Sequence, residues 1–305
     1  HLLGYHADEH PLALQLGGDD PDALARCAAI AVARGYDEIN LNVGCPSDRV
    51  QSGNFGVCLM RTPELVAACV AAMRAAVPAP VTVKHRIGVD ELDRYEDMAR
   101  FVEIVAEAGC DRFTIHARKA WLRGLSPKQN RTVPPLRYAD VHRLARARPD
   151  LGVEINGGLR SLDAILEQLE HVDAAMIGRA AWDDPWLFAS VDRDVFGDRS
   201  REPPSRPEVV ADYLEHVREW LGASPEPGAT RRGRGPSPTI LLRPLMNLFT
   251  GRPGARRWKQ ALNAKCQDPT ALDELHALAL ELDDLGRERD RERSGSLGVA
   301  ALDVG

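Results

Sequence analysis

One stretch decides the fold: Glu38-Ile39-Asn40-Leu41-Asn42-Val43-Gly44-Cys45-Pro46-Ser47. Its first half alternates apolar and polar residues, which predicts a strand. Its second half is a Gly-Cys-Pro turn, where Gly44 allows unusual backbone angles and Pro46 restricts φ. Because β/α barrels carry their active sites at the carboxyl ends of strands, Cys45 is a candidate for chemistry. The stretch alone leaves open the alternative of a small buried thiol in a tight turn.

Similar strand patterns recur along the chain, at residues 12–16, 81–86, 112–117, 152–156 and 174–179. A helix or helical stretch follows each of these strands, and repeated strand–helix units predict a parallel sheet. An open doubly wound sheet and a (β/α)8 barrel are both compatible with this order. A dinucleotide-binding sheet would show a G-x-G-x-x-G turn after its first strand, and the sequence has none there.

Polar residues at the strand ends favour the barrel, since successive strand ends then converge on one mouth. They are Gln15, Asn42, Lys84, His116, Asn156 and Arg179. Six units do not close an eight-stranded barrel, so two strands are expected to precede His1. The predicted fold is therefore a (β/α)8 barrel without its first two strands, followed by a helical bundle.

The strand–helix alternation stops after Phe196. We expect a barrel domain over residues 1–198 and a C-terminal helical domain over residues 199–285. Gly/Pro/Ser/Arg-rich composition predicts a disordered insertion at about 222–238, and residues 286–305 are expected to form a disordered tail.

Charge is unevenly distributed along the 305 residues, whose net charge is −6. Residues 227–267 contain nine Lys/Arg and no Asp/Glu, and residues 117–139 are also basic and free of acids. Such surfaces suggest a polyanionic partner, with ordinary solvated charge as the alternative. No apolar run is long enough for a bilayer span, and the cysteines show no CxxC spacing, so reduced thiols in a cytoplasmic protein are expected. No metal-binding motif is present.

Glycine loops end the last two predicted strands, at Asn156-Gly157-Gly158 and at Gly178-Arg179. Loops at this place in a barrel commonly hold a phosphate group, with simple turns as the alternative. Lys84, His116 and Gln15 would line the same mouth, and an amide suits the edge of a heteroaromatic ring. Lys84 could form a Schiff base or donate to an electron-rich ring, and His116 could be a base, a ligand or a core histidine. A phosphate loop beside Gln, Lys and His resembles a flavin mononucleotide (FMN) pocket, in which the lysine would stabilise the reduced ring.

The ordered motifs resemble the tRNA-dihydrouridine synthases. They are Asn40-Leu41-Asn42-Val43-Gly44-Cys45-Pro46-Ser47, Gly56-Val57-Cys58-Leu59-Met60, Val83-Lys84-His85-Arg86-Ile87-Gly88, Ile115-His116-Ala117-Arg118-Lys119 and Ile155-Asn156-Gly157-Gly158. The segment 119–131 is similar to the A subfamily in particular. The resemblance implies an FMN barrel with a C-terminal helical bundle that reduces a D-loop uridine of tRNA with NADPH. Uridine 20 is the expected target, with uridine 20a as the second candidate.

The resemblance also implies roles for individual residues. Cys45 would donate a proton to the uracil ring. The flavin contacts would be Gln15, Lys84, His116, Asn156, Gly157, Gly158, Gly178 and Arg179. The resemblance assigns tRNA contacts to Asn42, Lys128 and Arg131. The basic composition of the two acid-free stretches adds Arg118 and Lys119 in the first stretch and Arg243 and Arg256 in the second, with ordinary helix-surface charge as the alternative for the second stretch. The family's first strand carries a Pro-Met motif that is not in this sequence, and a monomer is expected.

Two other functions remain open at this stage. One is a flavin barrel that reduces a free pyrimidine, akin to dihydroorotate dehydrogenase, although a small substrate needs no basic surfaces. The other is a flavin-free tRNA-binding protein, which would bind tRNA in a salt-sensitive way without turning yellow.

Overall fold

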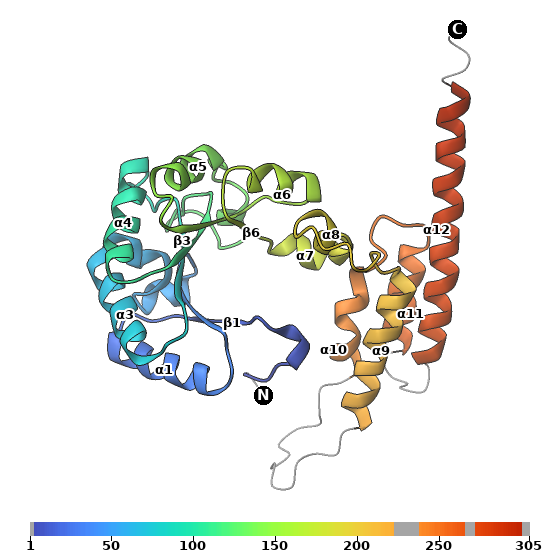
Figure 1. Cartoon of the computed structure of the whole chain (residues 1–305), viewed down its shortest axis with the longest axis horizontal. Coiled ribbons are helices and arrows are strands. Elements are labelled where there is room, and N and C mark those ends of the chain that lie inside the picture. The colour runs from blue at the N-terminus through green and yellow to red at the C-terminus, as the bar shows by residue number, and fades with distance from the viewer. Residues whose placement is uncertain (1–2, 223–237, 266–271, 301–305) are drawn as a thin grey trace. The chain divides into compact units, whose positions relative to one another are not determined.

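The computed structural model describes residues 3–222, 238–265 and 272–300, and the chain divides into two compact units, His1–Gly178 and Arg179–Gly305. The first unit contains one six-stranded parallel sheet in the order β1-β2-β3-β4-β5-β6 (Figure 1). Its strands are β1 (Ala13–Leu16), β2 (Glu38–Val43), β3 (Val81–Arg86), β4 (Arg112–His116), β5 (Gly152–Asn156) and β6 (Ala174–Met176). Each strand pairs with the next strand along the chain, which confirms the predicted strand–helix order.

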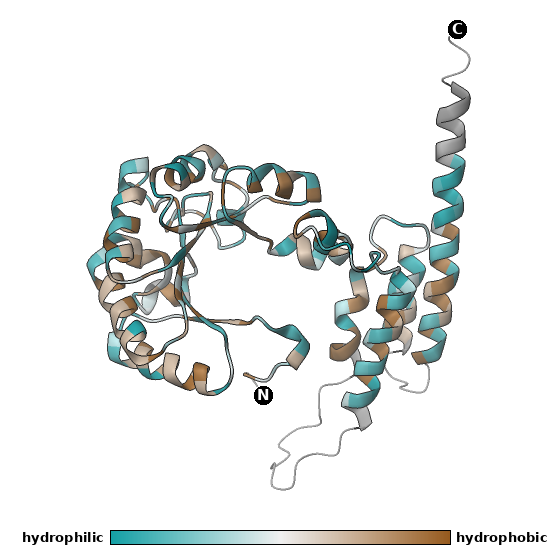
Figure 2. Cartoon of the chain, viewed as in Figure 1, coloured by the Kyte–Doolittle hydropathy of each residue, from teal (hydrophilic) through white to brown (hydrophobic). Residues whose placement is uncertain are grey.

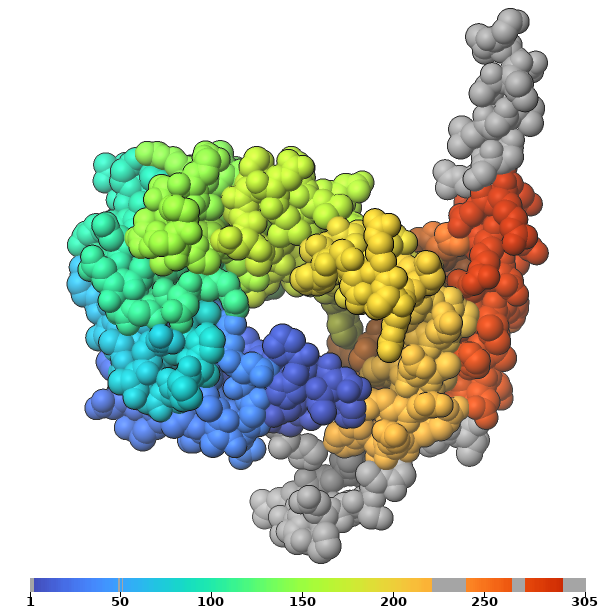
Figure 3. Space-filling view, in the orientation of Figure 1, coloured from blue at the N-terminus to red at the C-terminus, as the bar shows by residue number. Residues whose placement is uncertain are grey.

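Helices lie on the convex side of this curved sheet, in the manner of a TIM-barrel-like fold (Figure 1). They are α1 (Pro21–Ala33), α2 (Asp48–Ser52), α3 (Pro63–Ala76), α4 (Tyr95–Glu107), α5 (Tyr138–Ala147) and α6 (Leu162–Leu169). Short 3-10 turns, η1 (Ala7–Glu9), η2 (Gly56–Arg61) and η3 (Gln129–Arg131), complete this unit. In the space-filling view the unit forms a curved wall, coloured from blue to yellow-green (Figure 3).

Local sequence explains where several helices begin. The Asp20 carboxylate accepts a hydrogen bond from the Ala23 N–H at 2.8 Å, and the Ser161 hydroxyl accepts one from the Ala164 N–H at 3.2 Å. Both side chains satisfy N–H groups that a helix leaves without partners, and Pro21 occupies the first turn of α1. Ser161 is therefore the N-cap of α6.

The two faces of the sheet differ in polarity. Apolar strand residues such as Leu41, Val83 and Ile115 are fully buried, and Figure 2 colours much of β1 and β3 brown. The alternate positions are polar: Asn42 pairs in register with Lys84, and His116 with Asn156. Since side chains alternate across a strand, the in-register polar residues share one face of the sheet. The polar strand ends predicted from the sequence therefore belong to one surface.

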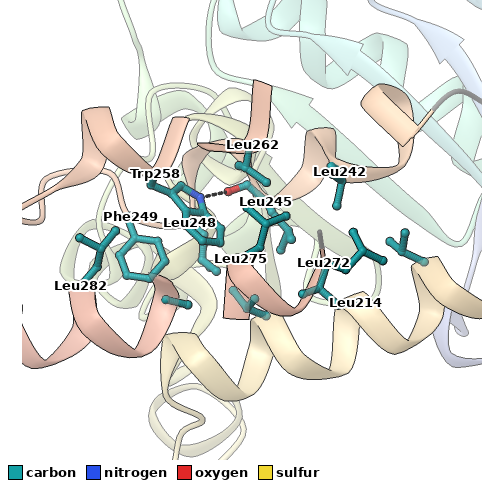
Figure 4. Packing of buried hydrophobic residues seen from close by; sticks show 13 residues of the cluster. Leu214, Leu242, Leu245, Leu248, Phe249, Trp258, Leu262, Leu272, Leu275 and Leu282 are labelled. Carbon is teal, nitrogen blue, oxygen red and sulfur yellow. Dashed lines mark hydrogen bonds between the residues drawn. The ribbon is translucent and has the colours of Figure 1, made fainter. Parts of the chain in front are cut away.

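The second unit is helical. It contains α7 (Arg179–Asp183), α8 (Val191–Asp194), α9 (Arg206–Gly222), α10 (Pro238–Leu242), α11 (Ala255–Lys265) and α12 (Leu272–Ala300), with 3-10 turns η4 (Pro185–Phe188) and η5 (Arg243–Asn247). Leucines from α9, α12 and η5 form its core around the fully buried Trp258 (Figure 4). The indole N–H of Trp258 donates to the Leu245 carbonyl at 2.8 Å, and its ring lies 4.8 Å from that of Phe249.

The end of the chain differs from the prediction. Residues 286–300 were expected to be disordered, but they continue α12. Ion pairs accompany this extension: Arg287 pairs with Asp283 one helical turn earlier, and Arg252 pairs with Asp290. Alternating charges at helical spacing stabilise a helix without an apolar face. The predicted disordered insertion falls almost entirely on residues 223–237, which lie outside the described residues. The predicted boundary between the barrel domain and the helical domain, at residue 198, stays a prediction.

Two further properties concern the described residues as a whole. None of their helices is both long and apolar enough to cross a membrane. No three His, Cys, Asp or Glu side chains among them form a cluster that could hold a metal ion.

Candidate active site

The Cys45 turn follows β2 and is held by the Asn42 side chain. Asn42 Oδ1 accepts hydrogen bonds from the N–H groups of Gly44 and Cys45, each at 3.0 Å. The thiol is partly exposed, and its Sγ lies 3.4 Å from the Ser47 hydroxyl. A short polar side chain that accepts from the residues after it fixes a turn in place. Cys45 is therefore an oriented and accessible thiol rather than a packed one.

Two other cysteines of this unit, Cys69 and Cys110, differ from Cys45 in their environment. Cys69 and Cys110 are buried, and burial raises the pKa of the Cys69 thiol to about 11 and that of Cys110 to about 12. Such thiols stay protonated and inert. The alternative of a small buried thiol thus fits Cys69 and Cys110, and not Cys45.

The glycine that this turn needs is Gly56, in η2. Gly44 does not adopt a left-handed conformation, whereas Gly56 has a φ of +69°. A Cβ on Gly56 would lie 2.7 Å from the Cys45 carbonyl oxygen, which no substituted residue tolerates. Gly56 lets η2 approach the Cys45 turn, and the Val57 N–H donates to the same carbonyl at 3.1 Å.

Lys84 and Asn156 meet at the ends of their strands. Lys84 Nζ donates to Asn156 Oδ1 at 2.9 Å, and Asn156 Nδ2 donates to the Met176 carbonyl at 2.8 Å. Burial, together with the neighbouring Arg86 charge, lowers the pKa of Lys84 to about 8, while Glu154 opposes this shift. The amine therefore remains largely cationic at neutral pH and is close to losing its proton.

The predicted phosphate loop lies next to His116. Gly157 and Gly158 both have positive φ, of +110° and +78°. A Cβ on Gly157 would lie 2.5 Å from the ring of His116, a buried residue, and one on Gly158 would lie 2.8 Å from the Tyr138 hydroxyl. The N–H groups of Gly157 and Gly158 donate no hydrogen bond within the described residues. A glycine loop with unused N–H groups has the donors that an anion needs.

Gly178 and Arg179 belong to different compact units. Gly178 ends the first unit, and Arg179 begins the second unit and α7. The predicted strand over residues 174–179 is shorter than expected, because β6 ends at Met176. The part of the flavin site assigned to Gly178 and Arg179 stays a prediction.

A buried arginine links the Cys45 turn to the basic loop, by which we mean Arg118–Arg131. Arg86 is 3% exposed. Its Nε donates to the Gly44 carbonyl at 2.9 Å, and its Nη1 donates to the carbonyls of Lys119 at 3.1 Å and Asn130 at 3.0 Å. Within the described residues it pairs with no carboxylate. Planar guanidinium groups suit such divergent acceptors, so Arg86 holds two segments together.

Asn130 organises the interior of the basic loop. It is fully buried, accepts a hydrogen bond from the Trp121 N–H at 2.8 Å and donates to the Trp121 carbonyl at 2.9 Å. The Trp121 side chain is nevertheless 49% exposed, and Lys119 Nζ lies 5.0 Å from its ring centroid. Neither Arg86 nor Asn130 was predicted individually from the sequence, although both lie in segments that resemble the family.

The cations of the basic loop are of two kinds. Lys119 pairs with Asp93 at 2.6 Å, and Arg118 donates to the Pro134 carbonyl; both are partly buried. Lys128 and Arg131 are exposed, and Arg131 Nε donates to the Pro127 carbonyl at 3.0 Å. Lys128 and Arg131 thus present charge outward, whereas Arg118 and Lys119 contribute to the structure of the loop.

The second unit shows a similar division. Arg243 and Arg256 are exposed, and the Arg243 guanidinium carbon lies 5.6 Å from the Trp182 ring centroid. Arg257 forms an ion pair with Glu281, and Arg252 forms one with Asp290. Neither of the two arginines predicted from the sequence, Arg243 and Arg256, forms an ion pair with a carboxylate among the described residues.

Gln15 lies on β1 and contacts β2. Its Oε1 accepts a hydrogen bond from Asn42 Nδ2 at 2.7 Å, and its Nε2 donates to Asn40 Oδ1 at 2.8 Å. The predicted flavin contact Gln15 and the predicted tRNA contact Asn42 are therefore bonded to each other beside the Cys45 turn.

Known proteins match this chain over most of its length. The family model described as Dihydrouridine synthase (Dus) matches residues 2–282. A Synechocystis protein named tRNA-dihydrouridine(20/20a) synthase is 54% identical over 280 residues, which cover 92% of this chain and 80% of the relative. Proteins of the same name from Vibrio parahaemolyticus and Escherichia coli K12 are 49% and 47% identical, cover 88% and 92% of this chain, and are each 79% covered themselves. With this match over fold, motifs and length, the chain belongs to the dihydrouridine synthase family of enzymes.

Proposed function

We propose that this enzyme reduces a uridine of the tRNA D-loop, uridine 20 with 20a as the second candidate, to 5,6-dihydrouridine, with FMN as cofactor and NADPH as electron donor. The names of the relatives support the substrate. The observation that carries the proposal is the partly exposed Cys45 thiol, held on a fixed turn at the same strand ends as Lys84 and the glycine loop.

The residues at these strand ends fit FMN. The unused N–H groups of Gly157 and Gly158 suit its phosphate, and Gly178 and Arg179 would complete that site. Gln15, Lys84, His116 and Asn156 offer donors and acceptors for a heteroaromatic ring. When bound, the flavin supplies the hydride for C6 of uracil and is itself reduced by NADPH. The Lys84 cation would favour a negatively charged ring beside it.

Cys45 would give a proton to C5 of the uracil. A thiol carries a proton that it can give to a reacting carbon as a general acid. The thiolate that remains carries a negative charge, and Arg86, which bonds to the residue before Cys45, supplies a nearby positive charge. Water then restores the proton, and no covalent intermediate on Cys45 is required.

The exposed cations would bind the tRNA around the reacting base. A uracil inside a folded tRNA must leave its stack to reach the strand ends. Lys128 and Arg131 can contact the phosphates, as can Arg243 and Arg256 on the second unit. Asn42 would contact the substrate base from beside the Cys45 turn.

The direct test is turnover of an unmodified tRNA transcript with FMN and NADPH, followed by mass spectrometry of the nucleosides and mapping of the modified position. Dihydrouridine at position 20 or 20a is expected. Reduction of free uridine or uracil at a comparable rate would instead indicate a small-molecule enzyme. Salt-sensitive tRNA binding by a colourless protein without turnover would indicate a flavin-free tRNA-binding protein.

The Cys45→Ala variant tests the proton donor. It should bind tRNA and flavin as the original chain does, while dihydrouridine formation falls by about 10²-fold or more, the usual range for a lost general acid. Ser47→Ala, which leaves the thiol in place, is the matched control and should retain most of the activity. Undiminished turnover by Cys45→Ala would exclude the proposed role.

A further inference from the structure

A continuous chain of side-chain hydrogen bonds runs along the polar face of the sheet and ends at the Cys45 turn. It contains the links Arg112 to Glu38, Glu38 to Thr82, Thr82 to Asn40, Asn40 to Gln15 and Gln15 to Asn42. This hydrogen-bond chain begins at the amino-terminal ends of the strands and links side chains of β1, β2, β3 and β4. Its middle members, Asn40 and Thr82, are 5% and 1% exposed.

The Cys45 end of the chain permits only one orientation of its amides. Backbone N–H groups can only donate, so the Asn42 atom that faces Gly44 and Cys45 must be Oδ1. Asn42 Nδ2 is then the donor to Gln15, which must present Oε1. Gln15 Nε2 in turn donates to Asn40 Oδ1.

The opposite end requires the same polarity independently. An ionised carboxylate only accepts, and Glu38 takes hydrogen bonds from Arg112 and from the Thr82 hydroxyl. The Thr82 oxygen is therefore free to accept from Asn40 Nδ2, at 2.8 Å. Both ends thus agree on the direction of every bond. A 180° rotation of any one amide would place two donors or two acceptors against each other.

We propose that Glu38, Thr82 and Asn40 are positioning residues for the proposed reduction, which act on Cys45 through Gln15 and Asn42. This inference rests on the proposed function for its catalytic consequence, but not for its geometry. With Asn42 oriented in this way, both lone pairs of Oδ1 hold the turn. The second N–H of Asn42 Nδ2 has no partner among the described residues, and the hydrogen-bond chain fixes the direction in which it points.

The orientation also defines what Asn42 offers to a substrate. Its oxygen is occupied, so it can only donate, and a carbonyl oxygen of a pyrimidine ring is the complementary group. The buried Thr82 supports the same orientation from another strand, through Asn40 and Gln15. Pre-set donors of this kind are effective because they need no reorganisation during the reaction.

The test uses the flavin-loaded enzyme with Thr82→Val, which keeps the shape of the side chain and removes the hydroxyl. Asn40 then loses its acceptor and can rotate. We expect kcat to fall about tenfold, the KM for tRNA to change less than about twofold, and the rate of Cys45 alkylation by iodoacetamide to change at least about threefold. Thr82→Ser restores the hydroxyl and should recover all three values to within about twofold.

Thr114→Val is the matched control. The buried hydroxyl of Thr114 also donates to a carboxylate, that of Glu154, but Thr114 is not part of the hydrogen-bond chain that leads to Asn42. It should leave the Cys45 alkylation rate within about twofold of the original value. Equal alkylation rates and equal kcat for Thr82→Val and the original chain would overturn the proposal.

Asn42 variants keep the test decisive if Thr82→Val does not fold. Asn42→Asp can still accept from the turn but cannot donate, so alkylation of Cys45 should be nearly unchanged while kcat falls. Asn42→Leu releases the turn, so both the alkylation rate of Cys45 and kcat should change. The same alkylation rate in both variants would overturn the inference. Alkylation requires no tRNA, so its result stands even if the original chain forms no dihydrouridine, which would refute the proposed function alone.

Discussion

Replacement of Lys84 by Met should change how the stability of the protein depends on pH. Lys84 is partly buried near the end of β3, and its pKa is lowered from 10.5 to about 8, mainly by burial and secondly by the Arg86 charge. The folded state therefore disfavours the protonated amine. The Lys84–Asn156 hydrogen bond at 2.9 Å compensates for part of this cost.

The magnitude follows from the difference between the two pKa values. The two pKa values differ by about 2.5, at about 1.4 kcal/mol for each whole number, so the protonated amine costs about 3.5 kcal/mol of folding free energy as an upper value. Between about pH 8 and 10.5 the unfolded chain binds more protons than the folded one, so stability rises with pH. Below pH 8 the full cost is present, and above 10.5 it has disappeared. The hydrogen bond to Asn156 persists for the neutral amine, so it contributes little to this pH dependence.

The assay is urea unfolding of the flavin-free chain at pH 7, 8, 9 and 10, with the Met variant beside the original. The difference in unfolding free energy should shift in favour of the original chain by about 2 kcal/mol between pH 7 and 10, which allows for partial hydration of the amine. Lys128→Met, at an exposed position, should give a difference that is constant with pH. A constant difference for Lys84→Met as well would refute the account of a destabilised buried cation.

Three other changes test other parts of the molecule. Replacing Lys128 and Arg131 by Ala should weaken tRNA binding and leave NADPH oxidation unchanged. The slope of the logarithm of the tRNA-binding constant against the logarithm of the salt concentration should become less steep by about 1 to 2, and an identical slope would exclude both residues as phosphate contacts. Trp258→Ala should cost about 3–5 kcal/mol by urea unfolding, because the indole is fully buried, whereas Trp220→Ala at a 45% exposed site should cost less than about 1. Arg86→Lys keeps a charge but loses the planar fork, so amide hydrogen exchange in the basic loop should accelerate about tenfold or more; unchanged exchange would show that the link is dispensable.

Local patterns in the sequence were sufficient for the framework of the first unit. Alternation and glycine punctuation predict each strand to within a few residues, because strand polarity and turn chemistry are properties of neighbouring residues. The exceptions have local causes too. The last strand is shorter than predicted, ending at Met176 before the helical Arg179, and the charged residues after 285 continue a helix by ion pairing rather than by apolar packing.

The site could be predicted only in outline, because its contacts join residues far apart in sequence. Cys45 and Lys84 are recognisable from their places at strand ends. That Gly56, and not Gly44, is the glycine the turn requires depends on how closely η2 approaches Cys45. The role of Arg86 depends on carbonyls 42 and 44 residues away, and no local pattern records such acceptors.

The polarity of the Gln15–Asn42 pair shows why residue type alone is an incomplete guide to a site. Glutamine and asparagine can each donate or accept, so the sequence leaves their roles open. The backbone N–H of Cys45 at one end and the Glu38 carboxylate at the other remove that freedom. What Asn42 can offer to a substrate is therefore fixed by the turn and supported, through Thr82, Asn40 and Gln15, by a carboxylate at the opposite ends of the strands. A substitution there, far from any reacting atom, should alter the chemistry before it alters the fold.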